Sequence, residues 1–444
     1  MLKKLFVFVM VLSLVLIAAS PMVPNDSPPG PSGTFGSAFT IQNMSASIAN
    51  CSYQFFNASG IAVYTSAGFA IAAGGSSFTY VPSIGALASG QYSGVVSCDQ
   101  QVSAVVNTGS ADSGGSYGAV SNTGTTWYAP NAYSNYYNYN TNFVVQNATS
   151  STVDVTVEII NTSGLVVATQ SATGVPAFAY VNFEQAGLAG LSANTSYSAK
   201  ITGTGALAVE SNIYGQGAAV NQLYSYSPFT SGSLIAYTPV IMNNYYGNIT
   251  ALTVQNLGAA IANVTVTYGT GLVQTQDIAP ASAYVFYTPS SGLPTGNSLG
   301  LTSATITSNQ NIVALVNEQN SYGRAASYTG FASGSTTVSL PIVMKRYFNY
   351  NTSVTCQNVG AAATNMTILY SNAATVTQTS IPANGTAIFY QPNETGLPDG
   401  FNGSATITSS SQPIVCVTNE DQNEGILGTT VHDQLFSYEG FAAP

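Results

Sequence analysis

The densest group of side chains that could do chemistry lies near the end of the chain. Glu420, Asp421 and Glu424 fall within the segment VTNEDQNEG, and Glu318 stands at the matching place 102 residues earlier. Carboxylates gathered on a loop are ligands that Ca²⁺ prefers, and Asp399 in a nearby turn could add another. The spacing matches no EF-hand loop. The sequence therefore leaves two interpretations open, a calcium site at Glu420, Asp421 and Glu424 or a solvated acidic loop.

Catalytic chemistry finds little support in the residue types. His432, followed by Asp433, is the one histidine of the 444 residues, and no Ser or Cys nucleophile motif accompanies the pair. A single histidine excludes multi-histidine metal sites and disfavours a Ser-His-Asp triad. Glycoside hydrolysis would need two carboxylates facing one cleft, and the 16 acidic residues form no evident pair. We expect no catalytic residues and no enzyme.

The charge balance excludes another class of function. Charged residues make up only 5% of the chain, with 6 basic and 16 acidic side chains and a net charge of −10. Nucleic-acid binding requires clustered Lys and Arg, so it is excluded. Apolar residues make up 45%, which is enough to build cores.

The N-terminus has the pattern of an export signal. Lys3 and Lys4 precede the apolar run 5–17, and Ala18, Ala19 and Ser20 follow it. A basic start, an apolar run too short to span a membrane and a small-residue end are typical of a signal peptide, here residues 1–20, and an uncleaved N-terminal anchor is the alternative. Residues 21–36 begin with a Pro-rich spacer. We expect an extracellular or cell-surface protein with no membrane span after signal removal.

The rest of the chain consists of four similar copies of one sequence unit. Each copy starts with a strand-like segment that ends in Gln-Asn, and the four asparagines are 104, 109 and 102 residues apart: Asn43, Asn147, Asn256 and Asn358. Copies two to four are preceded by a lead of proline and aromatic residues (YAPNAYSNYY, YTPVIMNNYY, SLPIVMKRYF), and copy one lacks it. The proposed copies span residues 37–122, 123–232, 233–335 and 336–444.

The local pattern predicts strands. In Val264–Tyr268 apolar residues alternate with threonine, as in a half-buried strand. Short alternating strands in units of roughly 100 residues predict antiparallel β-sandwiches of the immunoglobulin-like type. The fold class is therefore all-β, with four tandem immunoglobulin-like sandwiches arranged in a row.

Cysteine positions and glycosylation sequons add two further expectations. Two of the four cysteines lie in copy one and two in copy four. Of the three possible connectivities, the pairing within copies, Cys51–Cys98 and Cys356–Cys416, is the most economical.

Sequons of the Asn-x-Ser/Thr type are frequent, and they arise either for glycosylation or by chance in a chain rich in Asn, Ser and Thr. They occur at Asn25, Asn43, Asn50, Asn57, Asn147, Asn161, Asn194, Asn248, Asn263, Asn351, Asn365, Asn384, Asn393 and Asn402.

The aromatic leads allow two interpretations. Aromatic runs stand at corresponding places of the leads: Tyr133, Tyr136, Tyr137 and Tyr139 in the first, Tyr245 and Tyr246 in the second, and Tyr347, Phe348 and Tyr350 in the third. Tyrosine suits contacts with sugars or proteins. Because the leads lie at every boundary between copies, we favour packing at the junctions between sandwiches over ligand binding.

The repeated arrangement VQN…VTVTY…IPxxGxAxFY…ATITSxQPIVxxVNE resembles tandem immunoglobulin-like, adhesion-module-like repeats of secreted bacterial surface proteins, and more loosely those of archaeal S-layers. The resemblance covers residues 37–444. It implies a secreted structural protein of the cell surface, such as an S-layer, sheath or filament subunit, with self-association or other surface proteins and glycans as partners. The alternative is an adhesin or carbohydrate-binding array. No cofactor is expected beyond the calcium ion considered above.

Overall fold

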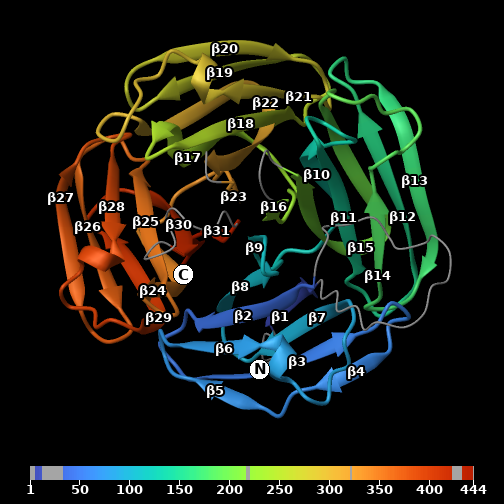
Figure 1. The fold of residues 1–444 in the computed structure, drawn as a ribbon, viewed down its shortest axis with the longest axis horizontal. Helices are drawn as coiled ribbons and strands as arrows, with labels where there is room; N and C mark the ends of the chain where they lie inside the picture. The colour runs from blue at the N-terminus through green and yellow to red at the C-terminus, as the bar shows by residue number, and fades with distance from the viewer. Residues whose placement is uncertain (1–5, 13–33, 217–220, 321–322, 423–432, 444) are drawn as a thin grey trace.

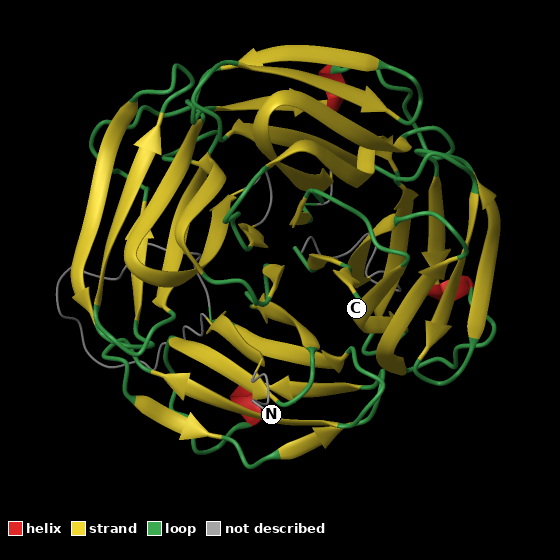
Figure 2. Ribbon diagram, turned by 180° about the vertical axis from the view of Figure 1, so that it is seen from behind, coloured by secondary structure: helices red, strands yellow, loops and turns green. Residues whose placement is uncertain are grey.

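The computed structural model describes residues 6–12, 34–216, 221–320, 323–422 and 433–443, and it is built almost entirely of antiparallel strands (Figures 1 and 2). The all-β prediction is confirmed. In the described residues, helical structure is limited to the short 3₁₀ turns η1 (Val81–Ser83), η2 (Thr288–Ser290) and η3 (Gln391–Asn393). The strands group into four sandwiches, numbered here as repeats one to four.

Repeat one contains two sheets, with the strand orders β1-β7-β3-β4, to which β5 adds beside β3, and β6-β2-β8-β9. For β1, only the backbone is described. The strands are β1 (Phe6–Leu12), β2 (Gly36–Asn43), β3 (Ala49–Phe56), β4 (Ala62–Thr65), β5 (Phe69–Ile71), β6 (Ser76–Tyr80), β7 (Tyr92–Cys98), β8 (Val102–Gly109) and β9 (Gly114–Gly118).

Repeat two has the same arrangement, except that one 20-residue strand, β15, passes from the first sheet into the second and so replaces the pair β7 and β8. Its strands are β10 (Gly124–Ala132), β11 (Tyr139–Asn147), β12 (Val153–Ile160), β13 (Val166–Val175), β14 (Tyr180–Glu184), β15 (Tyr197–Gln216) and β16 (Asn221–Tyr226).

Repeat three has the same strand arrangement as repeat two, and β22 is the strand shared by both sheets. Its strands are β17 (Ser233–Tyr245), β18 (Asn248–Asn256), β19 (Ala262–Tyr268), β20 (Val273–Ile278), β21 (Ala283–Tyr287), β22 (Leu301–Asn320) and β23 (Ala325–Thr329).

In repeat four the shared strand is divided again, and the sheets are β27-β26-β29-β24-β32 and β28-β25-β30-β31. Its strands are β24 (Thr337–Lys345), β25 (Tyr350–Asn358), β26 (Thr364–Tyr370), β27 (Thr375–Ile381), β28 (Thr386–Tyr390), β29 (Phe401–Ser409), β30 (Ile414–Gln422), β31 (Leu435–Glu439) and β32 (Phe441–Ala442).

Each core follows the alternation seen in the sequence. In β19, Val264, Val266 and Tyr268 are buried, and the threonines between them are half-buried or exposed. The side chains of one strand point alternately to the two faces of the sheet, so the apolar set of β19 lies between the two sheets of the sandwich. Removing this apolar area from water is the main stabilising contribution to each repeat.

The four sandwiches are arranged in a ring rather than in a row (Figure 1). Strands β9, β16, β23 and β31, one from each repeat, converge at the centre, where each contacts the next and β31 contacts β9. We call these four strands the hub. The expectation of sandwiches in a row was wrong, because repeat four packs against repeat one as closely as neighbours in sequence pack.

Candidate functional site

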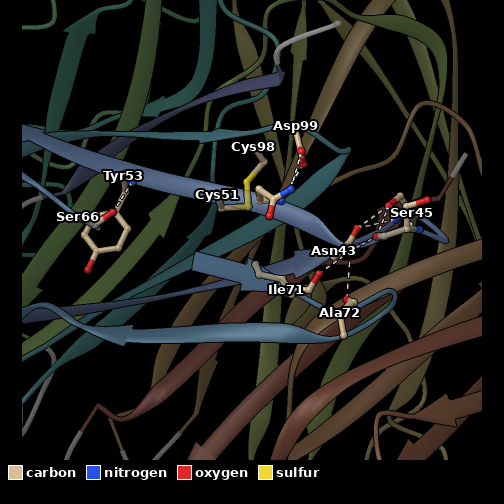
Figure 3. The surroundings of a disulfide bond; sticks show 11 residues. Asn43, Ser45, Cys51, Tyr53, Ser66, Ile71, Ala72, Cys98 and Asp99 are labelled. Carbon is tan, nitrogen blue, oxygen red and sulfur yellow. Dashed lines mark hydrogen bonds between the residues drawn. A yellow bond between two sulfur atoms is a disulfide. The ribbon is translucent and has the colours of Figure 1, made fainter. Parts of the chain in front are cut away.

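The Gln-Asn motif that marks each repeat has two separate roles. Asn256, fully buried, donates from Nδ2 to the carbonyls of Ala260 (2.8 Å) and Ile278 (2.9 Å), and its Oδ1 accepts from the amide of Gly258 (2.8 Å). The equivalent asparagine of every repeat makes the same contacts, as Figure 3 shows for Asn43. The asparagine therefore fixes the turn after its own strand.

In three of the four repeats the glutamine of the motif bonds to the preceding repeat in the ring, whereas Gln146 of repeat two donates to the carbonyl of Phe178 in its own repeat (3.4 Å). Gln255 donates from Nε2 to the carbonyl of Ala199 in repeat two (3.4 Å), and Gln357 donates to the hydroxyl of Thr305 in repeat three (3.4 Å). Gln42 donates to the carbonyl of Ala405 in repeat four (3.2 Å). The last contact joins the first and the fourth repeat. Repeat one therefore contacts repeat four in the same way as repeats three and four contact the repeats before them.

A second contact recurs at all four junctions. A buried serine near the start of β7, β15, β22 or β29 donates its hydroxyl to a backbone carbonyl in a turn of the next repeat, at a residue with positive φ. The four bonds are Ser93 to Phe178 (2.5 Å), Ser198 to Ala281 (2.8 Å), Ser303 to Asn384 (2.8 Å) and Ser404 to Gly74 (3.0 Å). The fourth closes the ring. Sequence reasoning missed these residues, although a serine before Ala or Gly at this place in each repeat was a readable signal.

The hub is polar and buried. Each hub strand places a serine opposite an asparagine of its neighbouring strand, and these pairs are Asn107/Ser116, Asn212/Ser225, Asn317/Ser327 and Asn419/Ser437. The serine hydroxyl donates to the asparagine in the last three pairs, over 2.6 to 2.9 Å. Buried polar groups need such partners, and they select one arrangement of the strands over others.

Acidic side chains connect the repeats across the hub. Asn107 donates to Oε2 of Glu420 (2.8 Å), and Asn419 donates to Oε2 of Glu318 (2.7 Å). Both glutamates are fully buried, and this burial raises the pKa of each to about 8. At neutral pH they are mostly protonated, which spares the hub two buried charges.

Asp433 is the residue at which all four repeats meet. It precedes β31 of repeat four, and its carboxylate accepts from the amides of Leu223 in repeat two (2.8 Å) and Ala325 in repeat three (2.6 Å). Its own amide donates to the carbonyl of Asp112 in repeat one (2.9 Å). The side chain is buried, and burial raises its pKa. His432, its neighbour in the sequence, lies outside the described residues.

The structure does not gather the acids considered for calcium. Successive residues of a strand point to opposite faces, so Glu420 bonds to Asn107 while Asp421 forms an ion pair with Arg324. Glu424 lies outside the described residues. Asp399 pairs with Arg346 (2.8 Å) in another loop. Among the described residues, no group of three or more His, Cys, Asp or Glu could hold a metal ion.

Both disulfides lie within repeats, as the sequence indicated. Cys51 is bonded to Cys98 between β3 and β7, and Cys356 is bonded to Cys416 between β25 and β30 (Figure 3 shows the first). Each bond joins directly opposed residues of one sheet rather than two sheets. Disulfides of this kind persist in oxidising compartments.

The described part of the chain contains no helix long and apolar enough to cross a bilayer.

The sequon asparagines differ in their accessibility. The side chains of Asn43, Asn147 and Asn351 are buried, and the first two use their amides to fix turns, so a glycan there would displace the fold's own hydrogen bonds. Asn25 lies outside the described residues. The remaining sequons are exposed or half-buried: Asn50, Asn57, Asn161, Asn194, Asn248, Asn263, Asn365, Asn384, Asn393 and Asn402.

The aromatic leads divide between the two interpretations. The buried Tyr133 packs in the core near the hub. The tip of the hairpin after each lead strand exposes an aromatic ring, with 66% of Tyr137, 61% of Tyr246 and 76% of Phe348 accessible. All three have positive φ (48°, 48° and 47°), and each stacks edge-on against the preceding tyrosine. The same exposed ring therefore recurs at the equivalent hairpin of repeats two, three and four.

Comparisons with known proteins leave the family open. No family model and no curated protein matches the chain. Among solved structures, Thermotoga maritima 1070 is 18% identical, with a TM-score of 0.20, and the match covers 22% of this chain and 94% of that one. The FN1–FN3 domains of chicken CNTN1 are 9% identical, with a TM-score of 0.10, and the match covers 66% of this chain and 90% of that one.

Proposed function

We propose that the protein is a secreted, non-catalytic structural subunit of the cell surface, such as the repeating unit of an S-layer, sheath or extracellular filament. The observation that carries the proposal is the serine-to-carbonyl bond made at all four junctions, including the junction of repeat four with repeat one. A chain that closes on itself in this way is a rigid body. Rigid bodies can be stacked side by side with little loss of conformational entropy.

The surface chemistry supports the same proposal. Charged residues are scarce, so neighbouring copies repel one another weakly, and the described surface exposes several large apolar side chains. The acids of the hub serve the contacts between repeats. The two disulfides and the export pattern of residues 1–20 are consistent with an extracellular location.

A second candidate function follows from the hairpin tips. Tyr137, Tyr246 and Phe348 present three exposed aromatic rings at equivalent hairpin tips, and aromatic rings stack on sugar faces and on protein surfaces. An adhesin or carbohydrate-binding protein would use them as one multivalent surface.

Electron microscopy of the purified protein, dilute and then concentrated, tests the first proposal. Ordered sheets or fibres that appear with concentration support it, and isolated discs at every concentration contradict it. Intact-mass analysis of the same sample shows whether sequons carry glycans.

The second candidate is tested by a glycan-binding screen with the triple variant Tyr137→Ser, Tyr246→Ser, Phe348→Ser. Its matched control changes three comparably exposed residues outside the hairpins and the loops bonded to them, Leu165→Ser, Leu234→Ser, Ile261→Ser. Loss of saturable binding in the first variant alone supports an adhesin. Equal binding by both variants excludes the tips as the binding surface.

A further inference from the structure

The outer rim of the ring is formed by edge strands that hold the same place in every repeat (Figure 1). In repeats two to four these rim strands are β13, β20 and β27, and each pairs with one strand only, β12, β19 or β26. In repeat one β4 and β5 take this place, and both pair with β3. Among the described residues, no strand therefore lies along the outer side of a rim strand.

Alternate residues of each rim strand point their backbone N–H and C=O groups away from the ring. In an antiparallel pair of strands, hydrogen-bonded and non-hydrogen-bonded residue pairs alternate. The amide of Tyr370 donates to the carbonyl of Ala374 (2.9 Å), and this bond fixes the alternation along β27. Thr377, opposite Thr367, therefore belongs to a non-hydrogen-bonded pair, and its N–H and C=O face solvent.

Ser171 of β13 and Thr275 of β20 hold the positions that match Thr377. They lie opposite Thr156 and Thr265, and the same hairpin bond begins both strand pairs. The three side chains at these positions are exposed, and their outward backbone groups have no partner among the described residues. A row of backbone donors and acceptors at the spacing of a strand is matched by another β-strand.

Two of the four rim positions carry features that block such a pairing. On β20 the exposed carboxylate of Asp277, which accepts from Nδ2 of Asn263 (2.8 Å), would lose water if a strand were added beside it. In repeat one the rim strand is interrupted at Ser66, between β4 and β5. The hydroxyl of Ser66 accepts from the amide of Tyr53 (2.9 Å), and its own amide donates to the carbonyl of Tyr53 (2.9 Å; Figure 3). A charge and an interruption are both means by which edge strands are kept from pairing.

The other two rim strands, β13 and β27, carry neither feature. The 10 residues of β13 and the 7 residues of β27 include no charged residue and no proline. Both strands are rich in Val and Thr, and uncharged segments of high β-propensity at a sheet edge pair readily with other strands. The two strands lie on opposite sides of the ring, because repeats two and four face each other across the hub (Figure 1).

We propose that β13 and β27 are docking surfaces for further copies of this chain, with β27 of one copy pairing along β13 of the next. Because the two strands lie on opposite sides of the ring, each copy binds two neighbours, and the copies form an open fibre rather than a closed dimer. The inference rests on the proposed function and specifies the contact through which the structural subunit assembles. Each contact involves few residues, so the fibre forms only at high protein concentration.

Proline variants test the pairing. Ser171→Pro and Thr377→Pro each remove an N–H that faces solvent, so the ladder within the repeat is kept and only an added strand loses its donor. Thr275→Pro makes the same change at the matching position of β20 and is the control. In sedimentation and electron microscopy, Thr275→Pro should form fibres at the wild-type concentration, and the other two variants should need a concentration roughly tenfold higher or more. Fibres of all three variants at the wild-type concentration overturn the proposal.

An equimolar mixture of the two variants separates lost pairing from misfolding. Thr377→Pro leaves β13 free and Ser171→Pro leaves β27 free, so each variant alone should stay monomeric and the mixture should form dimers and nothing longer. Dimers of Ser171→Pro alone would mean that β27 pairs with β27 of another copy, which overturns the proposed arrangement. A mixture that stays monomeric although both variants unfold cooperatively in urea overturns it as well.

Hydrogen exchange of the wild type needs no variant. The amides of Ser171 and Thr377 should exchange quickly in dilute protein and roughly tenfold more slowly or less in the assembled form, while the amide of Thr275 should not change. Slow exchange of Thr377 already in dilute protein means that another segment of the same chain covers β27, which overturns the proposal.

The two proposals fail in different ways. Assembled wild-type protein in which Ser171 and Thr377 still exchange quickly overturns the strand pairing and leaves the structural function standing. Wild-type protein that does not assemble at any concentration contradicts the proposed function, and the pairing with it.

Discussion

Raising the pH should loosen the ring at two specific carboxyl groups. Glu420 joins repeat four to repeat one through Asn107, and Glu318 joins repeat three to repeat four through Asn419. Burial raises the pKa of each to about 8, compared with 4.5 for an ordinary glutamate. Between pH 4.5 and pH 8 each glutamate keeps its proton in the folded protein but has lost it in the unfolded chain. The contribution of each group to the stability of the fold is therefore greatest below pH 4.5 and falls as the pH rises towards 8.

The size of the effect follows from the same shift. Each group lowers the free energy of unfolding by about 1.4 kcal/mol per pH unit within this window, so the loss from pH 5 to pH 8 is at most about 4 kcal/mol per group. Glu420→Gln keeps an oxygen that accepts from Asn107 and cannot ionise. The variant should therefore lose less stability over this range than the wild type, and the double variant with Glu318→Gln should lose less again.

Urea unfolding of the wild type and the Gln variants between pH 5 and pH 9 measures these slopes. Glu158→Gln, which changes a partly exposed carboxyl paired with Lys200, is the matched control and should keep the slope of the wild type. A wild type whose stability does not change between pH 5 and pH 8, or Gln variants with the wild-type slope, would refute the reasoning.

Three further predictions concern the junctions, the motif and the disulfides. Ser404→Ala and Ser198→Ala should each cost about 0.5–1.5 kcal/mol in urea unfolding, because each removes one hydrogen bond between repeats while the carbonyl keeps the motif glutamine as a partner, and only Ser404→Ala should increase the radius of gyration measured by X-ray scattering; equal radii would contradict closure of the ring at this bond. Asn256→Ala should cost about 3 kcal/mol or more through the loss of its hydrogen bonds, and a cost under 1 kcal/mol in the same measurement would show that the turn holds without them. Reduction of Cys51–Cys98 and Cys356–Cys416 should cost roughly 4 kcal/mol per bond and lower the thermal midpoint, and an unchanged midpoint would show that neither bond stabilises the ring.

The sequence by itself determined the strands and the division into similar units. Alternation such as that of Val264–Tyr268 depends on which face of one strand meets its own core, and that information is local. The Gln-Asn motif was visible as a marker, and the pairing of cysteines within repeats followed from their positions. The exposure of Tyr137, Tyr246 and Phe348 was not readable, since aromatic residues serve equally in a junction or on a surface.

Only the tertiary structure decided how the units are joined. The partner of Ser404 is Gly74, 330 residues away, and nothing in either segment identifies the other. A sequence repeat has the same pattern whether its copies form a row or a ring, because the choice depends on the small rotation between neighbouring units. The roles of Glu318, Glu420 and Asp433 follow from closure of the ring: these acids lie beyond the cores of their own repeats, and burial at the hub turns them from solvated carboxylates into structural groups.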